Sequence, residues 1–258
     1  MARRAAARIA VRTVGVLAAA SLVVFAEATA RRVRALREAG ARVPALAHDT
    51  VLAGSGRPCH LVVLGDSAAA GHGLPDADVG LARQLGRRIR ERTGRPVHVT
   101  SVAVDGATTA DVLATQVPAL DGGAEVVVVG VGVNDAIRGR APATVTDDTR
   151  RLLEATRVRA PGATVVLLTC PDLASAPGLP PALRPVLGRS CRRVAAAQRR
   201  AATAVRVAVV GADGHLPATA FGPDGFHPGT EGVAILADRV AATLWSEPRT
   251  PGRVSGRS

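Results

Sequence analysis

Lysine and tyrosine are absent from the chain, and all 33 of its basic side chains are arginines. Aromatic residues make up only 2% of the sequence, as three phenylalanines and one tryptophan. Proteins that bind single-stranded nucleic acid usually stack the bases on aromatic side chains. The scarcity of aromatics therefore argues against a nucleic-acid partner, although the net charge of +12 by itself would suggest one.

The positive charge is concentrated at the two ends of the sequence. Residues 1–42 contain nine arginines and two glutamates, a net charge of +7. Residues 247–258 contain three arginines and one glutamate, a net charge of +2, which leaves only +3 for everything between them. Nucleic-acid binding would call for basic residues clustered on the folded domain. We therefore expect no nucleic-acid binding.

Cysteines are few, and metal-binding patterns are missing. Cys59, Cys170 and Cys191 fit neither a metal cluster nor a dense disulfide framework. In an oxidising compartment Cys170 and Cys191 could pair, and two buried free thiols are the alternative. The six histidines show no HExxH spacing, and the sequence has neither a GxxxxGK[ST] nor a GxGxxG pattern. We expect no metal ion and no cofactor.

The N-terminal hydrophobic run, residues 14–26, is shorter than the roughly 20 residues that a membrane-spanning helix usually needs. Four arginines precede it and Ala-Thr-Ala follows at residues 28–30, as is typical of a secretory signal. Four more arginines between residues 31 and 37 would also flank an uncleaved anchor. An amphipathic helix lying on the membrane or on the domain is a further alternative. We expect an extracytoplasmic protein, secreted or membrane-anchored, with membrane association through residues 1–42.

What the chain does contain is a regular alternation of two kinds of segment. Valine-rich hydrophobic runs, which indicate buried strands, occur at residues 61–64, 97–104, 125–131, 163–169 and 205–211. Stretches with helical spacing lie at residues 78–93, 107–119, 142–160, 184–204 and 229–246. Hydrophobic strands that alternate with helices predict an α/β fold with a five-stranded parallel sheet covered on both faces.

Composition also sets the expected domain boundaries. Residues 43–57 are interpreted as a linker, residues 58–246 as one α/β domain and residues 247–258 as a disordered basic tail. Within the domain, residues 150–160 combine arginines with Leu152, Leu153, Ala155 and Val158, which predicts an amphipathic helix packed on the sheet.

Small and polar residues follow four of the predicted strands. Asp66 and Ser67 come after the first strand, Gly106 after the second, Asn134 and Asp135 after the third, and Asp224 and His227 after the fifth. Right-handed crossovers bring all these turns to the carboxyl edge of a parallel sheet, where such folds bind ligands. We therefore expect the four segments to converge on one site.

Together these residues have the chemistry of acyl transfer. Ser67 offers a hydroxyl nucleophile, His227 can take its proton, and Asp224 can fix the imidazole tautomer. The backbone N–H groups of Ser67 and Gly106 and the side-chain amide of Asn134 could stabilise an oxyanion. Each residue also has a structural interpretation when taken singly, as a helix cap or a turn residue. It is their joint occurrence that favours catalysis.

Other polar residues near these segments are given structural roles. Asp66 is expected to support the turn through backbone hydrogen bonds rather than to react. His72 and His215 are interpreted as surface or turn histidines.

The four segments, in this order, resemble the sequence blocks of the SGNH, or GDSL, hydrolase family. The matching blocks are Gly65-Asp66-Ser67, Gly106 in AVDGATT, Gly132-Val133-Asn134-Asp135 and Asp224-Gly225-Phe226-His227. The resemblance covers residues 58–246 and implies a flavodoxin-like three-layer α/β/α sandwich. The first block reads Gly-Asp-Ser-Ala rather than Gly-Asp-Ser-Leu. Asp105 stands where the family usually has a neutral residue, which weighs against anionic substrates.

The roles that the resemblance implies agree with those expected from the chemistry. Ser67 is the nucleophile, His227 the base and Asp224 its orienting acid, with Ser67, Gly106 and Asn134 as oxyanion donors. We expect a serine hydrolase that cleaves small-molecule acyl esters of lipid or cell-envelope sugar type. Acyl transfer to a sugar acceptor at the same site, or a non-catalytic membrane-tethered binding module, are the alternatives. Nothing in the sequence sets the oligomeric state.

Overall fold

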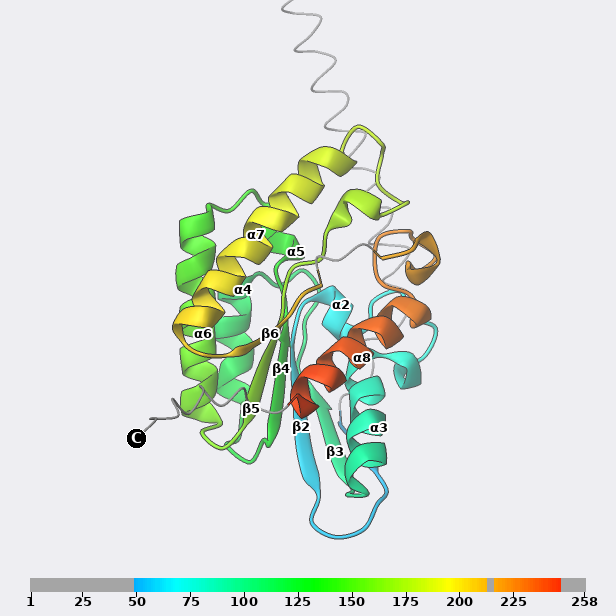
Figure 1. Ribbon diagram of the computed structural model, residues 1–258, viewed down its shortest axis with the longest axis vertical. Coiled ribbons are helices and arrows are strands. Elements are labelled where there is room, and N and C mark those ends of the chain that lie inside the picture. The colour runs from blue at the N-terminus through cyan, green and yellow to red at the C-terminus, as the bar shows by residue number, and fades with distance from the viewer. Residues whose placement is uncertain (1–48, 213–215, 247–258) are drawn as a thin grey trace, which may run out of the picture. The chain divides into compact units, whose positions relative to one another are not determined.

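The computed structural model describes residues 49–212 and 216–246, which form a sheet with helices on both faces (Figure 1). The strand order is β1-β3-β2-β4-β5-β6. The strands are β1 (Asp49–Leu52), β2 (Cys59–Gly65), β3 (Val97–Ser101), β4 (Val126–Gly130), β5 (Thr164–Leu168) and β6 (Ala208–Val210). The predicted N-terminal membrane segment, the basic tail and His215 lie outside the described residues.

The five predicted strands are all present and run parallel to one another, in the order typical of flavodoxin-like folds. The expected strand number is nevertheless wrong, because β1 adds a sixth strand at the edge, antiparallel to β3. Strand β1 lies within residues 43–57, which we interpreted as a linker. Those four residues belong to the sheet instead.

The helices form two layers that cover the two faces of the sheet (Figure 1). One layer contains α3 (Leu81–Thr93) and α8 (Thr230–Trp245), and the other contains α4 (Thr109–Asp111), α6 (Pro142–Arg159) and α7 (Arg184–Ala204). Two short helices, α2 (Ser67–Ala70) and α5 (Val133–Ile137), begin directly beyond the ends of β2 and β4. The predicted three-layer α/β/α architecture is therefore confirmed. No helix in the described ranges is long and hydrophobic enough to cross a membrane.

Alternate side chains of the central strand β2 enter the two hydrophobic cores. Leu61 and Val63 pack in the core beneath α3 and α8, whereas Val62 and Leu64 pack in the core beneath α6. All four are less than 5% exposed, because both faces of the strand are covered. This is why the strand is hydrophobic at consecutive positions and not only at alternate ones.

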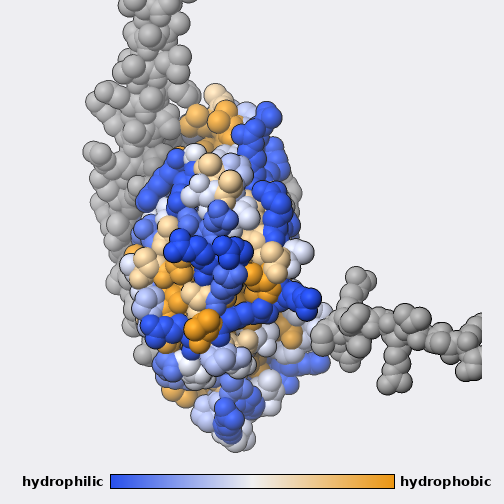
Figure 2. Space-filling view, turned by 90° about the vertical axis from the view of Figure 1, so that its left-hand side faces the viewer, coloured by the Kyte–Doolittle hydropathy of each residue, from blue (hydrophilic) through white to orange (hydrophobic). Residues whose placement is uncertain are grey.

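Helix α6 is amphipathic as predicted, with one difference. Leu152 and Leu153 are fully buried, but Val158, which we placed on the same face, is 79% exposed. Six residues along an α-helix correspond to a rotation of about 240° from Leu152, which takes Val158 off the buried face. On the side of the molecule where α6 lies, hydrophilic residues are interspersed with small hydrophobic patches (Figure 2).

The cysteines are buried and free. Cys59 begins β2, Cys170 follows β5 and Cys191 lies on α7. Of the two alternatives for Cys170 and Cys191, the structure therefore has the free thiols.

The end of β2 is fixed by an unusually close backbone contact. Gly65 pairs with Gly130 of β4, and a Cβ atom on Gly65 would lie only 2.1 Å from the carbonyl oxygen of Gly130. Gly65 also has a φ of +155°, in a region that favours glycine. The side chain of Gln116 completes the arrangement, because its Oε1 accepts from the Gly65 N–H and its Nε2 donates to the Gly65 carbonyl, both at 2.8 Å.

Replacing Gln116 with leucine should destabilise the fold. Gln116 is 2% exposed, and its loss leaves the Gly65 N–H buried without a partner. Such a loss costs about 1–3 kcal/mol, so chemical denaturation of Gln116→Leu should show a lower free energy of unfolding. The neighbouring exposed Thr115, as Thr115→Ala, is the matched control and should behave like the wild type. Equal stability of Gln116→Leu and the wild type would contradict the role assigned to the amide.

Candidate active site

Ser67 is the first residue of α2, immediately after the turn that ends β2. Asp66 is the N-cap of this helix, and its Oδ1 accepts a hydrogen bond from the Ala68 N–H at 3.2 Å. A residue in the first turn of a helix has no intrahelical acceptor for its N–H. The backbone N–H of Ser67 can therefore serve a ligand, as the sequence interpretation requires.

The structure brings Ser67, His227 and Asp224 together, although Ser67 and His227 are 160 residues apart. The Ser67 hydroxyl lies 3.0 Å from His227 Nε2, and His227 Nδ1 lies 2.5 Å from Asp224 Oδ2. Because a carboxylate only accepts, Nδ1 carries the proton and donates to Asp224. Nε2 is then free to accept from the Ser67 hydroxyl. This is the geometry of an activated nucleophile.

Asp224 is held as an anion by three donors. Its Oδ1 accepts from the backbone N–H groups of Phe226 and His227 at 2.9 and 3.0 Å, while its Oδ2 accepts from the His227 ring. Burial opposes ionisation of Asp224, but these hydrogen bonds outweigh it and lower the pKa of the carboxyl group. Asp224 is therefore suited to fix the imidazole and to stabilise its protonated form.

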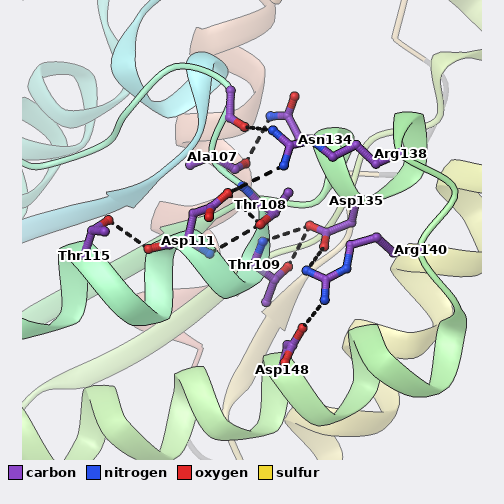
Figure 3. A network of polar contacts seen from close by, with 11 residues as sticks. Ala107, Thr108, Thr109, Asp111, Thr115, Asn134, Asp135, Arg138, Arg140 and Asp148 are labelled. Atoms are coloured by element: carbon purple, nitrogen blue, oxygen red, sulfur yellow. Dashed lines mark hydrogen bonds and ion pairs between the residues drawn. The ribbon is translucent and has the colours of Figure 1, made fainter.

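The two other predicted oxyanion donors lie outside residues 65–72, which we call the nucleophile turn: Gly106 is in the loop between β3 and α4, and Asn134 is on α5. Gly106 has a φ of +77°, a backbone conformation that residues with a side chain adopt only with strain. Within the described residues its N–H makes no hydrogen bond. Asn134 lies on α5 and uses its side-chain amide to donate to the Ala107 carbonyl at 3.0 Å (Figure 3). One N–H of that amide remains for a ligand.

A buried acid next to Asn134 anchors the loop that carries Gly106 (Figure 3). Asp135 is fully buried, and its Oδ2 accepts from both the backbone N–H and the hydroxyl of Thr109 at 2.9 Å. Burial raises the pKa of Asp135, and the hydrogen bonds from Thr109 oppose this effect. Arg140 lies 3.4 Å from Asp135 and 2.7 Å from Asp148 of α6. The sequence identified Asp135 only as a neighbour of Asn134.

Arg138, at the end of α5, holds the same loop from its exposed side. Its guanidinium donates to the Gly106 carbonyl at 3.1 Å (Figure 3). Sequence reasoning missed this residue, because an arginine just after a short helix carries no distinctive pattern. Arg138 and Asn134 together attach two successive carbonyls, those of Gly106 and Ala107, to α5.

Asp66 is placed as the turn support that we expected. It is only 2% exposed, and burial raises its pKa to about 7, an effect that the hydrogen bond from Ala68 partly offsets. Its cap position and its bond to Ala68 are those of a structural carboxyl group.

His72 was interpreted as a surface or turn histidine; it does lie in a turn, directly after α2, but its side chain is not on the surface. Its side chain is only 7% exposed, and its ring lies 4.5 Å from the ring of His227, measured between centroids. Its Nδ1 donates to Asp105 Oδ2 at 2.5 Å. The signal available in the sequence was Asp105, the acid that departs from the family pattern beside Gly106.

An apolar cavity of about 50 Å³ borders the nucleophile turn. Ala68 and Ala69 of α2 form part of its wall, which also includes Leu81, Leu168, Leu173, Leu216, Phe226 and Leu236.

Among residues 49–212 and 216–246, no three His, Cys, Asp or Glu side chains come together as metal ligands.

The chain is similar to several known proteins. Residues 63–235 match the GDSL-like Lipase/Acylhydrolase family. The "GDSL-like esterase Rv1075c" of Mycobacterium tuberculosis is 33% identical over 204 residues, which are 72% of this chain and 61% of that protein. Esterase TesA of Pseudomonas aeruginosa is 32% identical over 187 residues, which are 71% of this chain and 87% of that protein.

Solved structures share the fold. A crystal structure of TesA has a TM-score of 0.58 and 29% identity, covering 72% of this chain and 98% of its own. The lipase Lip_vut3 from a goat rumen metagenome has a TM-score of 0.62 at 16% identity, covering 73% and 99%, which shows a shared fold. The resemblance inferred from four short blocks is confirmed: the chain belongs to the GDSL-like lipase/acylhydrolase family.

Proposed function

We propose that this protein is a serine esterase that cleaves carboxylic esters through an acyl-enzyme formed on Ser67. One observation carries the proposal: the continuous chain from the Ser67 hydroxyl through His227 to Asp224, with separations of 3.0 and 2.5 Å. A serine whose hydroxyl hydrogen-bonds an imidazole, itself oriented by a carboxylate, is an activated nucleophile. The esterase names of the two relatives support the same reaction class.

In the first half-reaction Ser67 Oγ attacks the ester carbonyl carbon and its proton passes to His227 Nε2. The carbonyl oxygen becomes an oxyanion, which the N–H groups of Ser67 and Gly106 and the amide of Asn134 stabilise. When the intermediate collapses, the bond to the leaving alkoxide breaks and His227 returns the proton to it. The acyl group then remains on Ser67.

In the second half-reaction a water molecule gives its proton to His227 and attacks the acyl carbon. The carboxylic acid leaves, and the Ser67 hydroxyl regains its proton from His227. A sugar hydroxyl in place of water would give acyl transfer at the same site, and product analysis with a sugar acceptor distinguishes the two outcomes.

We further propose acyl esters of lipid or cell-envelope sugar type as substrates. Val104 is 54% exposed and lies two residues before Gly106, and Ile137 is 37% exposed and follows Asn134 on α5. Exposed hydrophobic residues beside the oxyanion donors suit an acyl chain, because ligand sites are mostly apolar with a few placed polar groups. A membrane-associated location, from the composition of residues 1–42, would bring the enzyme to such substrates.

The variant Ser67→Ala should lose at least about 10³-fold in kcat, because no acyl-enzyme forms. Fluorophosphonate labelling should disappear with it, while the circular dichroism spectrum stays unchanged. Ser55→Ala, an exposed serine away from the site, is the control and should keep wild-type rates. Turnover of p-nitrophenyl esters at the wild-type rate by Ser67→Ala would refute the mechanism, and a wild-type protein that fluorophosphonate does not label would favour the binding-module alternative.

The variant Asn134→Ala should lose about 10²–10³-fold in kcat with little change in KM, because an oxyanion donor acts mainly in the transition state. Steady-state kinetics on the same esters measures the two constants separately. Asn134 is buried and also holds the Ala107 carbonyl, so the melting temperature must be recorded alongside. An effect confined to KM would mark Asn134 as a substrate-binding residue instead.

Residues 1–42 should direct membrane association without contributing to turnover. The full chain should float with anionic vesicles in a density gradient, because this segment combines a +7 net charge with a hydrophobic run. A protein beginning at Val43 should stay in the aqueous fraction with the same kcat on a soluble ester. A full chain that does not float, or a shortened chain that loses activity, would show that the segment has another role.

A further inference from the structure

His72 joins two parts of the site that are far apart in sequence. It follows α2, and its backbone N–H donates to the Ser67 carbonyl at 2.9 Å, so it belongs to the nucleophile turn. Its Nδ1–H donates to Asp105 at 2.5 Å, across 33 residues of sequence. Asp105 is the residue immediately before Gly106. The pair therefore connects the nucleophile turn to the loop that carries an oxyanion donor.

The same imidazole also packs against the general base. The rings of His72 and His227 are 4.5 Å apart, with an angle of 41° between their planes. The rings of Phe226 and His227 also contact each other, in a T-shaped arrangement with their centroids 5.1 Å apart. His72 thus limits how far the His227 ring can tilt while it hydrogen-bonds Ser67 and Asp224.

A backbone bond from the Val104 N–H to the Gly65 carbonyl at 3.1 Å holds the start of the Gly106 loop to the end of β2. The side-chain bonds to the Gly106 and Ala107 carbonyls come from the opposite direction. Arg138 holds the Gly106 carbonyl and Asn134 holds the Ala107 carbonyl, and both residues belong to the α5 segment. Of the side-chain contacts made by this loop in the described structure, the bond from His72 to Asp105 is the one that reaches the nucleophile turn. Without it, the part of the loop beyond Val104, which includes Gly106, would have no side-chain bond to the turn that carries Ser67.

Fold stability alone does not explain His72. Its Nε2 is buried and has no hydrogen-bond partner among the described residues. A buried polar atom without a partner costs stability, so a hydrophobic ring of similar size would suit the fold at least as well. Asp105, whose side chain is already 51% exposed, could likewise be hydrated by water in place of the imidazole. The pair is better explained by what it does at the site.

We propose that His72 and Asp105 are positioning residues of the esterase: they fix the Gly106 N–H relative to Ser67 and back the His227 ring. This inference rests on the proposed function, because it assigns Gly106 to the oxyanion hole. The hydrogen bond also engages the Asp105 carboxylate, whose negative charge would otherwise oppose an oxyanion forming beside Gly106. His72 touches no reacting atom and acts through its two neighbours.

The test compares variants that separate the hydrogen bond from the ring contact. His72→Asn keeps a donor near the position of Nδ1, and His72→Phe keeps the ring but removes the donor. Asp105→Ala removes the acceptor. We expect His72→Phe and Asp105→Ala each to lower kcat by about 10- to 100-fold with KM within about twofold, since small displacements of catalytic groups have effects of this size. His72→Asn should recover much of the loss.

Two further readouts distinguish positioning from a general structural effect. Inhibition by an alkyl boronic acid, which forms a tetrahedral adduct with the serine, should weaken in parallel with kcat/KM, whereas inhibition by the matching carboxylic acid should not change. The double variant His72→Phe/Asp105→Ala should be no worse than either single variant, because both remove the same bond.

His60 provides the matched control. It stacks on His98 at 4.7 Å and hydrogen-bonds Thr100 at 3.0 Å, near the opposite end of β2 from the site. His60→Phe should keep wild-type kinetics. If the wild type turns over esters and His72→Phe and Asp105→Ala match it in kcat, the positioning role is wrong while the esterase assignment stands. If the wild type neither turns over esters nor is labelled at Ser67, the proposed function fails and this inference fails with it.

Discussion

The contact between Gly65 and Gly130 determines where the site can form. These two glycines end the central strands β2 and β4, and a Cβ atom on Gly65 would collide with the Gly130 carbonyl oxygen. The Asp66 N–H then donates to the Gly130 carbonyl at 3.1 Å, which continues the pairing by one residue before the chains separate. Because both strands stop at the same level, the nucleophile turn and the turn into α5 leave the sheet side by side. The proposed mechanism, in which Ser67 and Asn134 act on one substrate carbonyl, depends on this arrangement.

Where the strands separate, their backbone groups lose their partners, and two buried glutamine side chains replace them. Gln116 bonds both polar groups of Gly65. Gln198 of α7 accepts from the Cys170 N–H and donates to the Val131 carbonyl, both at 2.7 Å. Leaving these buried backbone groups without hydrogen-bond partners would lower the stability of the fold. The amides therefore allow the carboxyl edge of the sheet to open without destabilising it.

Much of this arrangement could be predicted from the sequence, because it depends on local patterns. Valine-rich runs located the five parallel strands, and parallel topology placed the residues after them at one edge. The remaining features depend on contacts between distant residues. Strand β1 is four residues long and is defined by its pairing with β3. His72 looked like an isolated turn histidine, because neither Asp105 nor His227 lies near it in sequence. Asp135 looked like part of a cap until its bonds to Thr109 were seen.

The imidazole–carboxylate pairs His227–Asp224 and His72–Asp105 lie next to each other. Their different surroundings suit them to different roles. The Asp224 side chain is 6% exposed and receives three hydrogen bonds, which lower its pKa and keep it charged beside His227. The Asp105 side chain is 51% exposed and, within residues 49–212 and 216–246, receives a side-chain hydrogen bond only from His72. A buried, fully bonded carboxylate responds little to solvent and can hold a base in one tautomer through a catalytic cycle. An exposed carboxylate with a single partner is the weaker electrostatic influence, which suits a residue beside an oxyanion, where a strong negative field would slow the reaction.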